Sequence, residues 1–276
     1  MPLDQKLSQR CFDKLKRQLS KLREDSAAES VHRFRSSTRR VEVLLGELQG
    51  ESTGNDKKLL KLLTNLRKKA GKVRDLDVQT GLLRNLKSPQ APGHKAQLQR
   101  AMAAERARRE KKLQKALGKK TIEEIRKRLR RAERDFEIPE NVEPLAIAKR
   151  LVNQVPAEET ITETVLHQYR IAGKRARYVA ELATNSSEAQ ALVRQLKAMQ
   201  DGIGDWHDWL QLTEHAEKLF GGMQDSSLVA QLKNVTRAKY REAVRMLGVT
   251  KAALSAKPVA VVRPLPRRIS AISSVA

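Results

Sequence analysis

One pattern of charged residues occurs twice in this chain, and this duplication constrains the fold more than any other feature of the sequence. The segments VHRFRSSTRR at 31–40 and LHQYRIAGKR at 166–175 both place basic side chains three, seven and eight positions after a histidine. The repeated positions are His32, Arg35, Arg39 and Arg40 in the first copy and His167, Arg170, Lys174 and Arg175 in the second.

A second pair of segments repeats at nearly the same spacing. GKVRDLDV at 71–78 aligns with GDWHDWLQ at 204–211, so Asp75 matches Asp208. Two separate matches at nearly one offset indicate a duplicated unit. We expect each unit to contain about four helices, which bury their apolar faces by packing as an antiparallel bundle.

Apolar residues recur every three or four positions through almost the whole sequence, which is typical of amphipathic helices. Strand signals are nearly absent, so we predict an all-α protein. Turn signals lie at 51–55, at 88–93 and in the proline-containing stretch 135–156. The predicted helices span 4–24, 29–49, 56–87, 94–117, 121–134, 142–154, 162–184, 188–219 and 226–247.

The stretch 135–156 is rich in acidic residues and separates the two copies of the repeat. We therefore predict a first helical-bundle repeat at 1–135 and a second at 136–250. The remaining segment, 251–276, holds three of the nine prolines and has no helical period. We expect it to be a flexible C-terminal tail.

The charge balance predicts a polyanionic partner. The 56 Lys and Arg residues exceed the 32 Asp and Glu residues and give a formal charge of +24, which destabilises a compact chain by self-repulsion. Nucleic acid, an anionic membrane surface and inorganic phosphate chains all fit this charge. Aromatic residues make up only 3%, which disfavours single-strand binding by base stacking.

Cysteine usage and hydropathy favour a cytoplasmic protein. Cys11 is the only cysteine, so the chain has no internal disulfide framework. The first residues, MPLDQKLSQR, do not resemble a secretory signal, and no apolar run approaches the roughly 20 residues that span a bilayer.

The repeated basic residues form stripes on the predicted helices, well round from the apolar face. In the first copy the apolar face carries Phe34, Val41 and Leu45. A charged stripe opposite an apolar one is also what any solvated amphipathic helix shows, but its repetition with histidine favours a function. Other basic residues form similar stripes: Arg10, Lys14, Arg17 and Lys21 on the first helix, Arg67 and Arg74 on the third, and Arg177 beside Lys174.

Glycine within the third predicted helix is also informative. Gly71 costs about 0.5–1 kcal/mol against alanine, so it marks a place where either a neighbouring helix or an anion comes close. The aligned Gly204 is open to the same two interpretations. Asp75 and Asp208 are candidates for fixed partners that hold a nearby arginine in one rotamer.

These segments together resemble the CHAD family, the conserved histidine α-helical domain. The likeness rests on VHRFRSSTRR, LHQYRIAGKRARY, GKVRDLDV and the GDWHD segment, and it covers about residues 4–247. It implies two tandem four-helix bundles related by pseudo-twofold symmetry, with the basic helices facing one another across a central groove or pore. It also implies a ligand, inorganic polyphosphate, and association with polyphosphate granules in bacteria.

The sequence departs from the family pattern at two places. Glu42 stands where the second copy has Arg177, so that part of the first half is expected to bind phosphate more weakly. His207 replaces the arginine that Arg74 represents in the first copy. Many relatives carry a fused triphosphatase domain marked by ExExK, and this chain has no such segment.

The resulting hypothesis is a polyphosphate-binding protein without enzymatic activity, catalytic residues, bound metal or cofactor. A nucleic-acid-binding helical protein is the alternative, favoured by the basic run at 95–131 but not by any known nucleic-acid-binding motif. His207 and Asp208, beside two tryptophans, form the one cluster that suggests chemistry, and packing at a bundle end is the favoured explanation for them.

Overall fold

The computed structural model describes residues 5–139, 142–156, 160–183, 186–221 and 226–255, and within these ranges the chain forms helices and no strand. Leu44–Leu48 forms a π-helical turn, and Glu181–Ala183 forms a 3₁₀ turn. The helices are α1 (Gln5–Glu24), α2 (Ala28–Val43), α3 (Gly54–Asn85), α4 (Pro92–Ala116), α5 (Lys119–Arg134), α6 (Pro144–Asn153), α7 (Glu163–Ala180), α8 (Ser187–Phe220) and α9 (Ser227–Ser255).

The all-helical prediction is confirmed, and the helix starts have visible local causes. Thr53 and Asp56 form a capping box at α3, and the Thr162 and Ser186 hydroxyls accept backbone N–H bonds at the starts of α7 and α8. Proline begins α4 and α6, where its missing N–H and fixed φ are tolerated.

The end of α9 differs from the prediction. The helix continues to Ser255 rather than ending at 247, because Leu247 is fully buried and Leu254 packs against the same core. The first five residues of the predicted tail are therefore helical, which corrects that boundary. The rest of the predicted tail, 256–276, lies outside the described residues.

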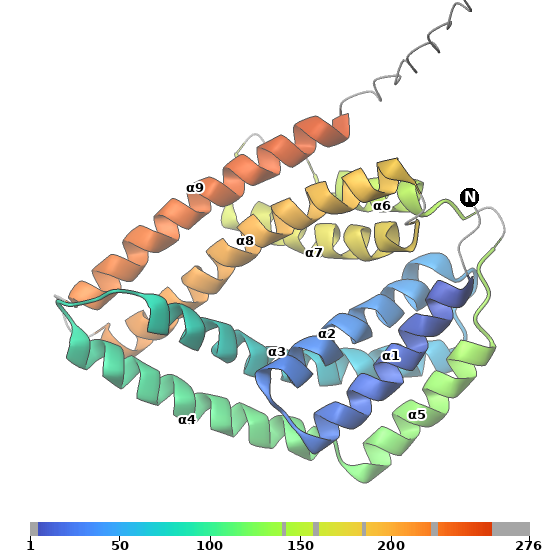
Figure 1. The fold of residues 1–276 in the computed structure, drawn as a ribbon, viewed down its shortest axis with the longest axis horizontal. Helices are drawn as coiled ribbons and strands as arrows, with labels where there is room; N and C mark the ends of the chain where they lie inside the picture. Colours follow the sequence, from blue (N-terminus) through green and yellow to red (C-terminus); the bar gives the residue numbers. More distant parts are fainter. Residues whose placement is uncertain (1–4, 140–141, 157–159, 184–185, 222–225, 256–276) are drawn as a thin grey trace, which may run out of the picture.

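Helices α1–α5 pack around one another in the first half of the chain, and α6–α9 do so in the second (Figure 1). The halves meet where α2 contacts α7 and α3 contacts α8. Among the described residues the first half has five helices, as the predicted ranges within 1–135 do, and the long α3 pairs with α4 at one end and with α5 at the other. The pseudo-twofold relation between the halves stays a prediction of the repeat.

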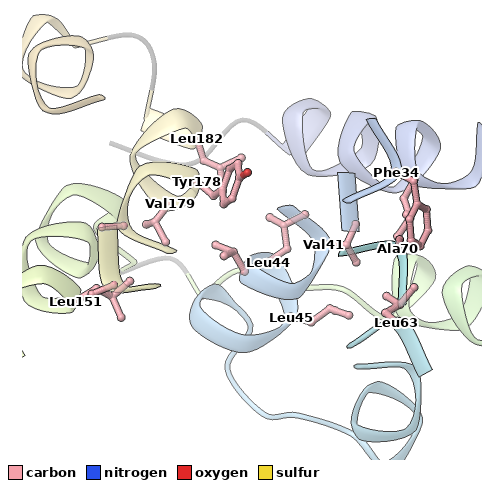
Figure 2. Close-up of a cluster of buried hydrophobic side chains, with 14 of the residues drawn as sticks. Phe34, Val41, Leu44, Leu45, Leu63, Ala70, Leu151, Tyr178, Val179 and Leu182 are labelled. Atoms are coloured by element: carbon pink, nitrogen blue, oxygen red, sulfur yellow. The ribbon is translucent and has the colours of Figure 1, made fainter. Parts of the chain in front are cut away.

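One hydrophobic core crosses the boundary between the halves. Leu44, at the end of α2, lies in a cluster with Tyr178, Val179 and Leu182 from the end of α7 (Figure 2). All four side chains are less than a tenth exposed. The two halves therefore share one hydrophobic core.

A second, smaller core lies where the α3–α4 hairpin meets the α8–α9 hairpin (Figure 1). Leu83 of α3 and Leu98 of α4 pack there with Leu212 and Phe220 of α8 and with Leu228 of α9. Helices α3 and α8 both run from the main core to this second core. Their middle turns, between the two cores, are therefore held in place from both ends.

Candidate functional site

A cavity of about 560 Å³ opens between α2, α3, α7 and α8, where α3 and α8 pass from one core to the other. Eight of the residues predicted from the repeats and stripes line it. They are His32, Arg35, Arg39, Arg40, Arg74, Arg170, Lys174 and Arg177. Basic side chains from both halves of the chain therefore converge on one space.

Charge in the cavity is unbalanced. Seven arginine and lysine side chains line it, against four aspartates. Two of those aspartates have partners of their own, since Asp201 pairs with Lys197 at 2.6 Å and Asp205 pairs with Lys239 at 2.6 Å. The acidic residues therefore do not neutralise the cationic wall.

Burial and the excess of positive charge lower the pKa of Lys174 further than that of Arg39, which lines the same cavity. Burial, followed by the nearby guanidiniums of Arg170 and Arg39, lowers the pKa of Lys174 to about 6. Burial and the Arg67 and Arg35 charges likewise lower the pKa of Arg39 to about 10. The lowered pKa favours the neutral amine form of Lys174 in the free protein. An anion bound in the cavity would raise this pKa and favour the charged ammonium form.

The guanidinium of Arg35 lies in the space that the absent side chain of Gly71 leaves on the facing helix. Its Nη1 atom donates a hydrogen bond to the backbone oxygen of Arg67 at 3.3 Å. A Cβ atom at Gly71 would lie 2.2 Å from the same Nη1 atom, far inside van der Waals contact. The close approach expected at Gly71 is therefore the guanidinium of Arg35. Gly204 has no such neighbour within 4 Å and instead lines the cavity.

Arg170 carries a buried donor without a protein acceptor. Its Nε atom is inaccessible to solvent and has no hydrogen-bond partner among the described residues. Burial raises the pKa of Asp208 to about 6, and the carboxylate of Asp75 acts on Arg170 through space. Within the described chain no ion pair of either aspartate is found, and both act on Arg170 through space, so their role in fixing an arginine rotamer stays a prediction.

One carboxylate joins the two halves at an edge of the cavity. Glu181 pairs with Arg40 of α2 at 2.9 Å and with Arg177 of α7 at 2.6 Å. Both guanidiniums also lie over the ring of Tyr178, 5.0 and 4.8 Å from its centroid. Each carboxylate oxygen of Glu181 therefore forms an ion pair with one of two cavity-lining guanidiniums.

Glu42, one of the two departures from the family pattern, forms an ion pair with a basic side chain of α3. Glu42 pairs with Arg67 at 2.8 Å, which places Arg67 behind the cavity lining rather than in it. In the second half the corresponding positions hold Arg177 and Gln200, and Arg177 Nε donates to Gln200 at 3.0 Å. Gln200 also donates to the backbone oxygen of Gly173, which fixes its orientation.

Several predicted site residues lie outside the cavity lining. Arg175 is half-exposed and pairs with Glu47 of the π-helical turn, so it faces away from Lys174 although it is adjacent in sequence. His167 is exposed, with its ring 6.1 Å from that of His207. The stripe on α1, formed by Arg10, Lys14, Arg17 and Lys21, is exposed and does not line the cavity.

The histidines that remain near the cavity favour the neutral form. Burial and the charge of Arg74 lower the pKa of His32, and burial with Arg170 lowers the pKa of His207 to about 4. An anion bound among these groups would raise both pKa values.

Other lining residues were missed by the sequence analysis. Asp201, Asp205 and Gln200 of α8 and Tyr178 of α7 all border the cavity. Extending the 133-residue offset would have aligned Gln200 with Arg67, so this position had a usable signal. Tyr178 had none, because its place at the cavity edge depends on the contact between the two halves.

Neither a metal cluster nor a membrane span is evident in the described part of the chain. No group of three or more His, Cys, Asp and Glu residues there is placed to hold a metal ion. None of its helices combines the length and apolar character needed to cross a bilayer.

Comparison with known proteins agrees with this architecture. The CHAD domain family model matches residues 6–217, and the chain therefore belongs to the CHAD domain family. No curated protein matches the sequence.

Two solved structures share the fold. The CHAD domain from the plant Ricinus communis aligns with a TM-score of 0.67 and 18% identity over 91% of this chain and 89% of that one. PptA from Streptomyces chartreusis aligns with a TM-score of 0.65 and 16% identity over 90% and 96% of the respective chains. At these identities the likeness establishes the fold alone.

Proposed function

We propose that the cavity binds inorganic polyphosphate and that the protein acts as a binding module without chemistry of its own. One observation carries the proposal: Arg35, Arg39, Arg170 and Lys174 converge from both halves, and none of them forms an ion pair with the residues that the structure describes. Grouping these cations costs stability in the free protein, as the lowered pKa values of Lys174 and Arg39 indicate. A bound polyanion would offset that cost.

The chemistry of the lining fits a flexible chain of phosphates. Arginine binds phosphate oxygens through paired, charge-assisted hydrogen bonds, and lysine acts as a point charge. The unpartnered Nε–H of Arg170 would gain an acceptor from a phosphate oxygen. The resemblance to the CHAD family, which implies a polyphosphate ligand, supports the same assignment. By analogy with nucleic acids, release of condensed counterions should make the affinity fall steeply with salt.

The experiment compares two sets of four substitutions, each of which replaces four Arg and Lys residues. In the cavity set, Arg35, Arg39, Arg170 and Lys174 become glutamine. In the surface set, Arg10, Lys14, Arg17 and Lys21 become glutamine, all on the exposed face of α1. We expect calorimetric titration with long-chain polyphosphate to show a loss of at least 100-fold for the cavity set and less than 10-fold for the surface set. Equal losses would remove the assignment of the cavity.

Nucleic acid remains a second candidate because of the basic surface on α4 and α5. Five lysines there are exposed and form no ion pair within the described chain: Lys111, Lys112, Lys115, Lys119 and Lys120. A competition assay separates the two ligands. Displacement of polyphosphate by duplex DNA at equal phosphate concentration would favour the nucleic-acid function.

A cytoplasmic location on polyphosphate granules follows from the proposed ligand. Fluorescently tagged protein should gather on granules, and the cavity set of glutamine substitutions should disperse it. The absence of chemistry is tested by incubating the protein with polyphosphate and Mg²⁺. Release of orthophosphate above background would overturn the non-enzymatic part of the proposal.

A further inference from the structure

A second cavity, of about 500 Å³, lies on the other side of α8, between α9 and the start of α7. Its volume falls in the range of small-molecule sites, about 300–1,000 Å³. The lining comes from three helices: Thr162 and Glu163 of α7, Trp206 of α8, and Thr236, Arg237, Tyr240 and Arg241 of α9. None of these residues borders the cavity assigned to polyphosphate.

Two aromatic side chains form one wall of this second cavity. The rings of Trp206 and Tyr240 meet edge to face, with their centroids 5.8 Å apart. The Tyr240 hydroxyl donates to the backbone oxygen of Ile161, which fixes the ring beside the start of α7. A planar ring of a ligand can pack against such a wall with a gain beyond simple burial of apolar area.

Trp206 also carries an unused donor. Its side chain is 2% exposed, and its indole Nε1–H has no hydrogen-bond partner within the described ranges of the chain. Buried indole N–H groups usually have a partner, and an unsatisfied donor costs about 1–3 kcal/mol.

The remaining lining residues supply charge of both signs. Arg237 and Arg241 lie one turn apart on α9, are exposed, and form no ion pair within the described chain. The first turn of α7, an 18-residue helix, adds backbone N–H donors and the positive end of the helix dipole. Glu163 adds one acceptor for an amino group.

From this combination we propose that the second cavity is a binding site for a nucleoside phosphate. The base packs against the ring of Tyr240, which the buried Trp206 supports from behind, and its amino group donates to the Glu163 carboxylate. The phosphates bind the guanidiniums of Arg237 and Arg241. The site is independent of the polyphosphate cavity, because the two share no lining residue.

Adenosine diphosphate is the probe for this site. Replacing Trp209 with phenylalanine leaves Trp206 as the only tryptophan of the two in the chain, so emission then reports the second cavity. We expect titration with the diphosphate to change that emission. Arg237→Gln with Arg241→Gln should weaken binding at least 10-fold, whereas Arg245→Gln, on the same helix and exposed, should change it less than twofold.

The cavity set of glutamine substitutions distinguishes this site from the first. We expect those four changes to leave adenosine diphosphate binding within twofold of wild type, whatever they do to polyphosphate. An unchanged affinity in the Arg237/Arg241 variant would overturn the proposal, as would a loss of diphosphate binding in the cavity set.

Discussion

Replacing Lys174 with methionine should stabilise the free protein. The ammonium lies among Arg35, Arg39 and Arg170, and its pKa falls to about 6 from an ordinary 10.5. Folding at pH 7 releases a proton that the unfolded chain would bind with a pKa of 10.5, and since one pKa unit corresponds to about 1.4 kcal/mol, this release costs up to about 5 kcal/mol. Because the cavity opens to water, which screens the cluster, we expect a gain of about 1–3 kcal/mol.

The pH dependence of this gain follows from the direction of the pKa change. Between pH 6 and 10.5 the unfolded chain keeps the Lys174 proton and the folded chain releases it, so the wild type becomes more stable as pH rises. Methionine removes that dependence. The gain should therefore be largest at or below pH 6 and shrink steadily towards pH 10.

Thermal unfolding at a series of pH values measures this effect. A gain of 1–3 kcal/mol corresponds to a rise in Tm of about 3–10 °C for a chain of this size. Lys68→Met, an exposed position on α3, is the matched control and should change Tm by little at any pH. The reasoning is refuted if Lys174→Met lowers Tm, or if its gain matches the control and does not vary with pH.

Three further results are expected. Gly71→Ala should weaken polyphosphate binding about 10-fold in calorimetric titrations, because the added Cβ displaces the Arg35 guanidinium. Gly81→Ala is the control, since a Cβ there has no neighbour within 4 Å; it should leave binding intact and, in thermal melts, stabilise α3 by about 0.5–1 kcal/mol. Polyphosphate affinity should rise up to about 10-fold per unit as pH falls from 8 to 6, because binding returns a proton to Lys174, and a titration series that shows no rise contradicts this. Glu181→Gln should raise polyphosphate affinity by freeing two guanidiniums and should lower Tm, and unaltered affinity would show that this carboxylate does not compete with the ligand.

The periodicity of the sequence was enough to predict most of the helices and the cationic lining. Because a helix repeats every 3.6 residues or so, Arg35, Arg39 and Arg170 fall on faces that a duplicated fold brings together. The same reasoning failed for Arg175. Adjacent residues on a helix point about 100° apart, and the acceptor that fixes Arg175 belongs to the π-helical turn of the other half.

The sequence could not show how closely the two halves join. The core around Leu44 and Tyr178 depends on contacts between segments more than 130 positions apart, which no local pattern specifies. The role of Gly71 was open for the same reason, since only the facing helix shows that a guanidinium takes the space of a Cβ atom. The sequence did not distinguish Arg67 from the other basic residues, because only the fold brings its ion-pair partner Glu42 beside it.

A structure of the protein with a short polyphosphate tests the central claim most directly. We predict phosphate density within the first cavity, with oxygens in hydrogen-bond reach of Arg39, Arg170 and Lys174 and an acceptor at the buried Nε atom of Arg170. Phosphate density confined to the exposed faces of α1, α4 or α5, with the cavity occupied by water alone, would contradict the account.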